Sequence, residues 1–183
     1  QGDPASFTVI ASTTPAGGTI NYQWQKKDYG TNAWINIPGA TSVSANICVQ
    51  AGSKYETCSN SGVSHFLEHM LFKGTKSWPT PESLSGAIEN IGGEINALTS
   101  KEYTMYWAKV PYTQWKVATN ILLDMCMNPL MESAEITRER NVIHEELRMY
   151  TDHPSYQSEL GIDELMFPEH PMGREIVGSH ESL

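Results

Sequence analysis

Two strand-like segments at residues 94–100 and 102–110 are separated by a single residue, and this spacing constrains the fold strongly. The second segment is rich in Tyr, Thr and Trp, which are favoured in strands. Strands joined this closely pair in an antiparallel sheet. A further strand is predicted at 42–49, and helices at about 63–73, 80–91, 111–127, 133–150 and 155–167. We therefore predict an α+β fold, a mainly antiparallel sheet with helices packed against it.

The helix at 80–91 has the clearest boundaries. Thr80 is a typical N-cap residue, Pro81 suits the first helical position, and Glu82 adds an early acid. Two consecutive glycines, Gly92 and Gly93, end the helix.

Composition excludes several classes of protein. The 183 residues suffice for one domain or two small ones, and a content of 39% hydrophobic and 18% charged residues fits neither a disordered tail nor a coiled coil. A net charge of −9 argues against a nucleic-acid surface. No apolar run approaches the roughly 18 residues that a membrane span needs. The three cysteines form no CxxC pair, and we expect free, buried thiols.

The chain changes character near residue 42, and we divide it into residues 1–42 and 43–183. The first part is β-rich and neutral, whereas all six histidines and all eight methionines lie in the second. The run Tyr22-Gln23-Trp24-Gln25, with strands expected at 7–11, 20–25 and 34–39, resembles the front half of bacterial immunoglobulin-like surface modules. The first methionine is Met70, so we expect a fragment or a processed product.

The sequence His65-Phe66-Leu67-Glu68-His69 carries the clearest chemistry. On a helix, His65 and His69 lie one turn apart on the same face, where two imidazoles can bind one Zn²⁺. Glu68 leans over the same edge and is placed to accept a proton from a water activated by the metal. Five residues also fit an ordinary solvated helix face, so the pentapeptide alone leaves both interpretations open.

A second helix offers a third ligand. Glu139 and Glu146 are seven residues apart and share one face after two turns. The run from Gly62 to Thr75, GVSHFLEHMLFKGT, resembles the M16 metallopeptidases, the family of insulinase, pitrilysin and the β subunit of mitochondrial processing peptidase. In that family a glutamate ligand follows the pentapeptide after 76 residues, and here residues 70–145 precede Glu146. The run from Glu139 to Glu146 also resembles the ligand helix of the family.

The resemblance covers residues 42–183 and implies a set of roles. His65, His69 and Glu146 would bind one Zn²⁺ per chain, Glu68 would be the general base, and Glu139 would orient a ligand histidine. Two alternatives stay open: Glu145 is the rival third ligand, and Glu139 could be an exposed acid. His144 should point away from the metal.

The family resemblance also implies where substrate binds. The run Asn96-Ala97-Leu98-Thr99 resembles the edge strand that receives the peptide backbone, and we assign substrate binding to Asn96 and Ala97. An ordinary sheet strand is the alternative for this segment. The fold implied is the metallohydrolase unit of the LuxS/processing-peptidase type, preceded by a short β-rich segment.

The function expected is zinc-dependent endopeptidase activity on a peptide or protein substrate. Family members are several-fold longer, so we expect a truncated unit whose second homologous unit, in cis or in trans, is missing. The alternatives are a catalytically incomplete zinc-binding fragment or scaffold, and a surface-binding module resting on residues 1–42. The compartment stays open, because an immunoglobulin-like start favours an extracytoplasmic location and free thiols favour the cytoplasm.

Overall fold

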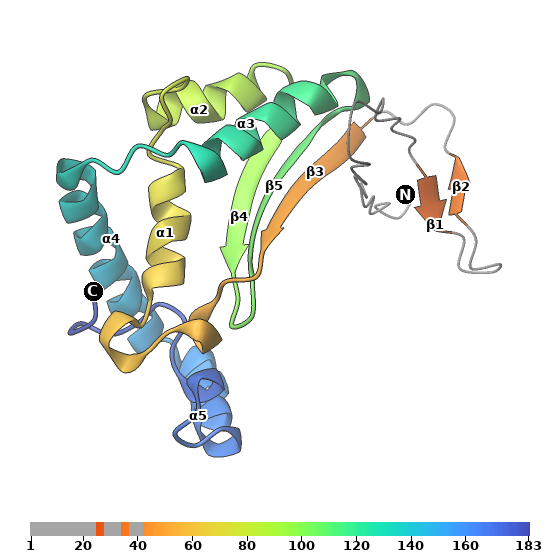
Figure 1. The fold of residues 1–183 in the computed structure, drawn as a ribbon. Helices are drawn as coiled ribbons and strands as arrows, with labels where there is room; N and C mark the ends of the chain where they lie inside the picture. The colour runs from red at the N-terminus through yellow and green to blue at the C-terminus, as the bar shows by residue number, and fades with distance from the viewer. Residues whose placement is uncertain (1–24, 28–33, 37–41) are drawn as a thin grey trace, which may run out of the picture.

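A three-stranded antiparallel sheet is the centre of the fold. The computed structural model describes residues 25–27, 34–36 and 42–183 (Figure 1). The strands β3 (Ser42–Val49), β4 (Glu94–Thr99) and β5 (Thr104–Pro111) take the order β3-β5-β4, with Ala45 opposite Ala108 and Ala97 opposite Tyr106. The predicted α+β class and the antiparallel pairing are confirmed.

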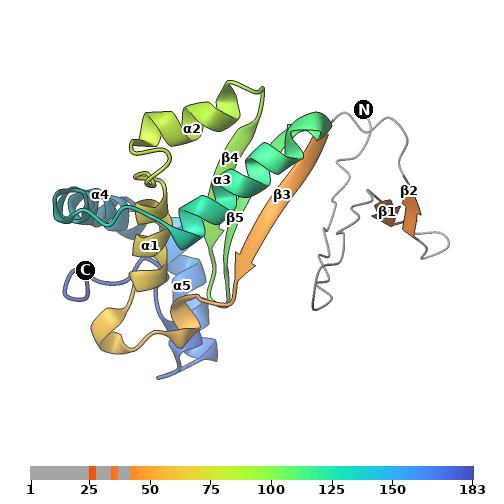
Figure 2. The same ribbon diagram turned by 45° about the horizontal axis from the view of Figure 1, so that its top comes forward.

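Five α-helices accompany the sheet in the described part of the chain: α1 (Val63–Leu71), α2 (Pro81–Glu89), α3 (Trp115–Met127), α4 (Ser133–Thr151) and α5 (Pro154–Met166). In Figures 1 and 2, α3 crosses the strands, and α1 lies between β4 and α4. The short 3-10 helices are η1 (Ser53–Tyr55), η2 (Cys58–Asn60), η3 (Tyr112–Gln114) and η4 (Pro171–Gly173).

Most predicted element ends differ from the structure by one or two residues, and two of the differences have a clear physical cause. The strand predicted from 102 begins at Thr104, because Ser100 to Tyr103 form a turn in which the Ser100 N–H donates to the carbonyl of Tyr103 at 2.8 Å. The helix predicted from 111 begins at Trp115, because Pro111 keeps the extended backbone of β5 and a 3-10 turn follows. The predicted start of α2 is confirmed, since the Thr80 side chain accepts from the Ser83 N–H.

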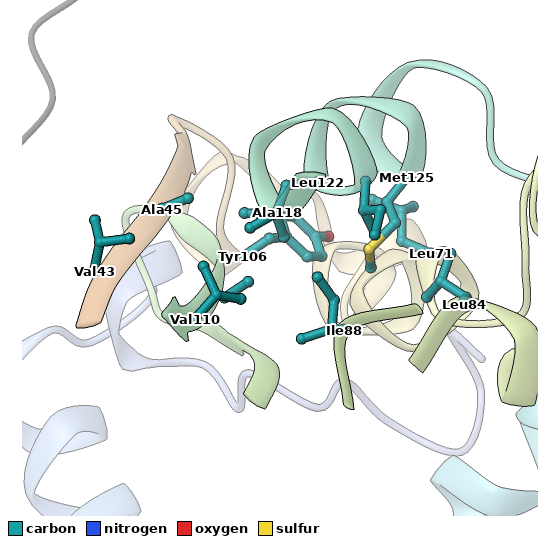
Figure 3. Close-up of a cluster of buried hydrophobic side chains, with 12 residues drawn as sticks. Val43, Ala45, Leu71, Leu84, Ile88, Tyr106, Val110, Ala118, Leu122 and Met125 are labelled. Atoms are coloured by element: carbon teal, nitrogen blue, oxygen red, sulfur yellow. The ribbon is translucent and has the colours of Figure 1, made fainter. Parts of the chain in front are cut away.

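The hydrophobic core lies between one face of the sheet and the helices α1, α2 and α3. Alternate residues of β5, including Tyr106, Ala108 and Val110, point into it, as Figure 3 shows for Tyr106 and Val110. Ile121, Leu122 and Met125 of α3 are fully buried there, and Trp115 packs partly buried against the cluster.

A second, smaller apolar cluster joins α1 to α4. Ile143 and Leu147 of α4 pack with Val177, and Phe66 of α1 packs against them. Gly62 has a left-handed backbone with φ of 89°, and a Cβ there would lie 2.3 Å from the Val177 carbonyl oxygen. A glycine therefore allows the segment around Val177 to close against the start of α1.

Several predictions concern residues near the N-terminus or the surface. Of the strand predicted at 34–39, residues Trp34–Asn36 form β2, paired antiparallel with β1 (Gln25–Lys27), and residues 37–39 lie outside the described residues. The strands predicted at 7–11 and over most of 20–25, together with the run Tyr22-Gln23-Trp24, lie outside the described residues.

The expectation of buried thiols is wrong for Cys48 and Cys58, which are exposed; Cys126 is half-buried, and none of the three is in a disulfide. Within the described residues, none of the helices combines the length and the apolar character needed to cross a bilayer.

Candidate metal centre

Helix α1 presents His65, Glu68 and His69. Its N-terminus is held by a residue outside the helix: the buried carboxylate of Glu56 accepts from the backbone N–H groups of Gly62 at 2.7 Å and Ser64 at 2.8 Å. These N–H groups have no partner within the helix, and a carboxylate also interacts favourably with the helix dipole. Glu56 therefore fixes the start of the helix that carries the two histidines.

His65, His69 and Glu146 form a compact cluster of possible metal ligands, with one donor atom from each lying within 4.8 Å of the others. Nε2 of His65 is 3.8 Å from Oε1 of Glu146, and Nε2 of His69 is 3.5 Å from Oε2. Donors about 2.0–2.2 Å from a tetrahedral zinc lie roughly 3.3–3.6 Å apart. The donor types and the 3.5 Å separation fit a zinc ion, and the 3.8 Å separation is only slightly longer than this range.

Glu139 lies directly behind His69. Its carboxylate is only 3% exposed, with Oε1 2.8 Å from Nδ1 of His69 and Oε2 2.5 Å from Nζ of Lys73. Burial alone would raise the pKa of Glu139, but the hydrogen bonds and charges of Lys73 and His69 outweigh it and lower the pKa. An ionised Glu139 can only accept, so Nδ1 donates this hydrogen bond, and in the neutral tautomer that fits it Nε2 keeps a free lone pair.

His65 is the more buried of the two histidines, at 9% exposure. Burial, and then the neighbouring His69, lower its pKa. The lowered pKa favours the neutral ring, which is the form that binds metals. Its Nδ1 is buried without a hydrogen-bond partner, so no second contact fixes this ring as Glu139 fixes that of His69.

Glu68 points toward strand β4. The hydroxyl of Thr99, at the end of that strand, donates to Oε2 of Glu68 at 2.5 Å. The sequence assigns no role to Thr99, and the structure shows that it contacts Glu68. One oxygen of Glu68 is thereby held, and Oε1 is the one left for other partners.

Glu146 has a hydrogen-bond donor of its own. The hydroxyl of Tyr150, one turn further along α4, donates to Oε1 of Glu146 at 3.0 Å. Burial first, and then the Glu146 carboxylate, raise the pKa of Tyr150, so the phenol keeps its proton.

The residues expected to bind substrate lie on β4. Asn96 is exposed and Ala97 is half-buried, on a strand whose described partner is β5. The Ala97 N–H donates to Oδ1 of Asn96 at 2.8 Å. A backbone donor of this strand is thus occupied by its own neighbour.

The structure also separates the alternatives. Glu145, the rival third ligand, has a side chain 70% exposed and pairs with Arg148. His144 points away from the cluster and stacks on His180, with ring centroids 4.9 Å apart. The alternative of an exposed Glu139 is wrong, because Ile143 and Leu147 turn that face of α4 inward.

Sequence reasoning missed Lys73, Tyr150, Glu56 and Thr99. Tyr150 follows Glu146 by four residues, a helical spacing that could have indicated this contact. Lys73 instead contacts Glu139, which is distant in the sequence. Nothing in the sequence pattern points to Glu56 or Thr99, whose contacts join separate elements.

Curated relatives are similar over most of this chain. An uncharacterized zinc protease of Bacillus subtilis is 38% identical over 148 residues, which is 81% of this chain and 36% of the relative. The mitochondrial-processing peptidase subunit beta of Dictyostelium discoideum is 41% identical over 144 residues, 76% of this chain and 30% of the relative. The chain thus spans roughly a third of the length of these relatives.

Solved structures and a family profile agree with these relatives. The chain resembles a protease from Helicobacter pylori with a TM-score of 0.73, at 23% identity over 78% of this chain and 34% of that one, which shows a shared fold. The profile described as "Insulinase (Peptidase family M16)" matches residues 32–180. The chain belongs to the insulinase family of peptidases, family M16.

Proposed function

We propose that this chain binds one zinc ion through His65, His69 and Glu146 and acts in the hydrolysis of peptide bonds. The observation that carries the proposal is the convergence of three suitable donors, with Nδ1 of His69 hydrogen-bonded to Glu139 and Nε2 directed toward Glu146. Relatives named zinc protease support it. Zinc bound there would supply a Lewis acid that polarises the scissile carbonyl and lowers the pKa of a water molecule.

Glu68 is the proposed general base. Thr99 holds Oε2, so Oε1 would accept the proton of the attacking water and then pass it to the leaving amine. The hydrogen bond from Thr99 would also restrict rotation of the Glu68 carboxylate. Glu139, through His69, would act as a positioning residue.

The proposed substrate is an extended peptide that adds to β4 as a further strand. An edge strand offers unpaired backbone groups, which an extended peptide can satisfy. The Asn96 side chain occupies the Ala97 N–H, so a peptide that used this donor would first displace Asn96. Asn96 is exposed and free to rotate away.

Hydrolysis and metal binding are separate parts of this proposal. The chain spans roughly a third of its relatives' length, and one relative is a peptidase subunit named β. We propose that a second homologous unit completes substrate binding for efficient turnover. A zinc-binding unit that hydrolyses peptides slowly or not at all without that partner is the alternative.

The test compares wild type, His65→Ala and Glu68→Gln by zinc content and by cleavage of unstructured, fluorogenic peptides. Wild type should hold about one zinc per chain, and His65→Ala should lose it. Glu68→Gln should keep the zinc and lose turnover, because Gln cannot accept the proton. The exposed Glu145→Gln on α4 is the control and should match wild type in both assays.

The outcomes separate the parts of the proposal. A Glu68→Gln variant with full turnover would refute the role of Glu68. Wild type that binds zinc without cleaving any peptide would favour the incomplete unit, and wild type without zinc would refute the ligand set.

A further inference from the structure

Glu146 is linked through two tyrosines to a carboxylate in the segment that follows α5. Tyr150 donates to Oε1 of Glu146 at 3.0 Å, and its ring stacks on Tyr156 of α5, with centroids 4.5 Å apart and planes 16° from parallel. The Tyr156 hydroxyl donates in turn to Oε1 of Glu175. Helix α4, helix α5 and the segment that contains Glu175 are therefore connected next to Glu146, the third proposed ligand.

The end of this chain of contacts is anchored to backbone. Oε1 of Glu175 also accepts from the Ile176 N–H at 3.1 Å and lies 3.5 Å from the Val177 N–H. Val177 is 3% exposed and packs with Ile143 and Leu147 of α4. The carboxylate of Glu175 is thus fixed by its own segment, and that segment is fixed against the ligand helix.

The two oxygens of Glu146 have different surroundings. Oε1 receives the Tyr150 hydroxyl and lies 3.8 Å from Nε2 of His65, whereas Oε2 lies 3.5 Å from Nε2 of His69. The hydrogen bond from the Tyr150 hydroxyl occupies one lone pair of Oε1 and restricts rotation of the Glu146 carboxylate. Oε2 is left as the better metal donor.

We propose that Tyr150, supported by Tyr156 and Glu175, is a positioning residue that holds Glu146 for binding zinc through Oε2. This inference rests on the ligand set of the proposed function. Outer contacts of this kind typically contribute 10- to 100-fold to metal affinity. The stacking of Tyr150 on Tyr156 restricts the rotation of both side chains, and this keeps the Tyr150 hydroxyl directed at Glu146. A single phenol on a solvated helix face would rotate freely.

The experiment measures the zinc Kd of the 183-residue chain by competition with a chromophoric chelator, and the visible spectrum of its Co²⁺ form. Tyr150→Phe keeps the stacked ring and removes only the hydroxyl, so we expect zinc binding weakened by about 10- to 100-fold. The Co²⁺ bands should shift as the carboxylate is released. Tyr156→Phe should weaken binding less, because Tyr150 still donates to Glu146.

The control is Tyr112→Phe, in the exposed turn before α3, which should change neither readout. Thermal unfolding of the metal-free variants checks that Tyr150→Phe is folded, and the Co²⁺ spectrum reports the ligand geometry independently of stability. Unchanged affinity and an unchanged spectrum in Tyr150→Phe, with wild type binding zinc, would overturn this inference alone. Wild type that binds neither metal would overturn both it and the proposed ligand set.

Discussion

Replacing Glu139 by Gln tests how the metal site is held together. The carboxylate is 3% exposed and accepts from Nδ1 of His69 and from Nζ of Lys73. Glutamine keeps the size and one acceptor oxygen, but it removes the charge that pairs with Lys73 and that favours a proton on Nδ1. A hydrogen bond to a charged group contributes about 1.5–3 kcal/mol, and loss of such an outer contact lowers metal affinity about 10- to 100-fold, or roughly 1.4–2.7 kcal/mol. The two ranges overlap, so we expect Glu139→Gln to bind zinc about 10- to 100-fold more weakly.

The assay is zinc binding by chelator competition at constant pH and ionic strength, with Glu145→Gln as the matched control. Glu145 lies on the same helix, and its pair with Arg148 is exposed, so its loss should change affinity by less than about twofold. A Glu139→Gln variant within twofold of wild type would refute the argument that this carboxylate sets the His69 tautomer. Weakening of both variants to the same degree would show an effect of net charge instead.

Three further predictions concern the scaffold and the thiols. Glu56→Ala should lower the free energy of unfolding by roughly 1–3 kcal/mol for each buried N–H it leaves unpaired, as measured by urea denaturation, and a loss below 0.5 kcal/mol would contradict the capping role. Gly62→Ala should destabilise the fold because its Cβ would meet the Val177 carbonyl, whereas Gly161→Ala, in an open helical position, should stabilise it by about 1 kcal/mol; equal melting temperatures would contradict this. Burial raises the pKa of the Cys126 thiol, so a smaller fraction of this thiol is ionised at pH 8 than in an ordinary cysteine. Cys126 should therefore react with iodoacetamide more slowly than the exposed Cys58, and its own rate should keep rising toward pH 10. Equal labelling of the two cysteines by mass spectrometry would refute this.

The secondary structure could be predicted from the sequence because its signals are local. The strand at 42–49 has the predicted bounds, and helix α4 extends the predicted 133–150 by one residue. Two of the ends that differed, at Thr104 and Trp115, depend on a hydrogen bond within a turn and on the extended backbone of Pro111. Periodicity does not report either feature.

The site was harder to predict because its contacts cross long stretches of chain. His69 and Glu139 are 70 residues apart, and Glu68 and Thr99 are 31 apart. The spacing of His65, His69 and Glu146 indicates the two helices that the structure brings together only in combination with the family resemblance. Which oxygen of Glu146 faces which histidine, and which carboxylate caps α1, depend on side-chain directions that no spacing rule contains.

The proposed metal binding and the proposed hydrolysis depend on different parts of the described structure. The three proposed ligands come from α1 and α4, which the cluster of Phe66, Ile143, Leu147 and Val177 holds together. Their supporting contacts, from Glu139, Tyr150 and Glu56, also come from residues near these two helices. By contrast, the proposed substrate contacts are limited to the backbone of β4, and a single strand pairing leaves side-chain pockets for specificity to other surfaces. Zinc affinity should therefore be largely complete in this chain, while turnover should rise when a second homologous unit is added.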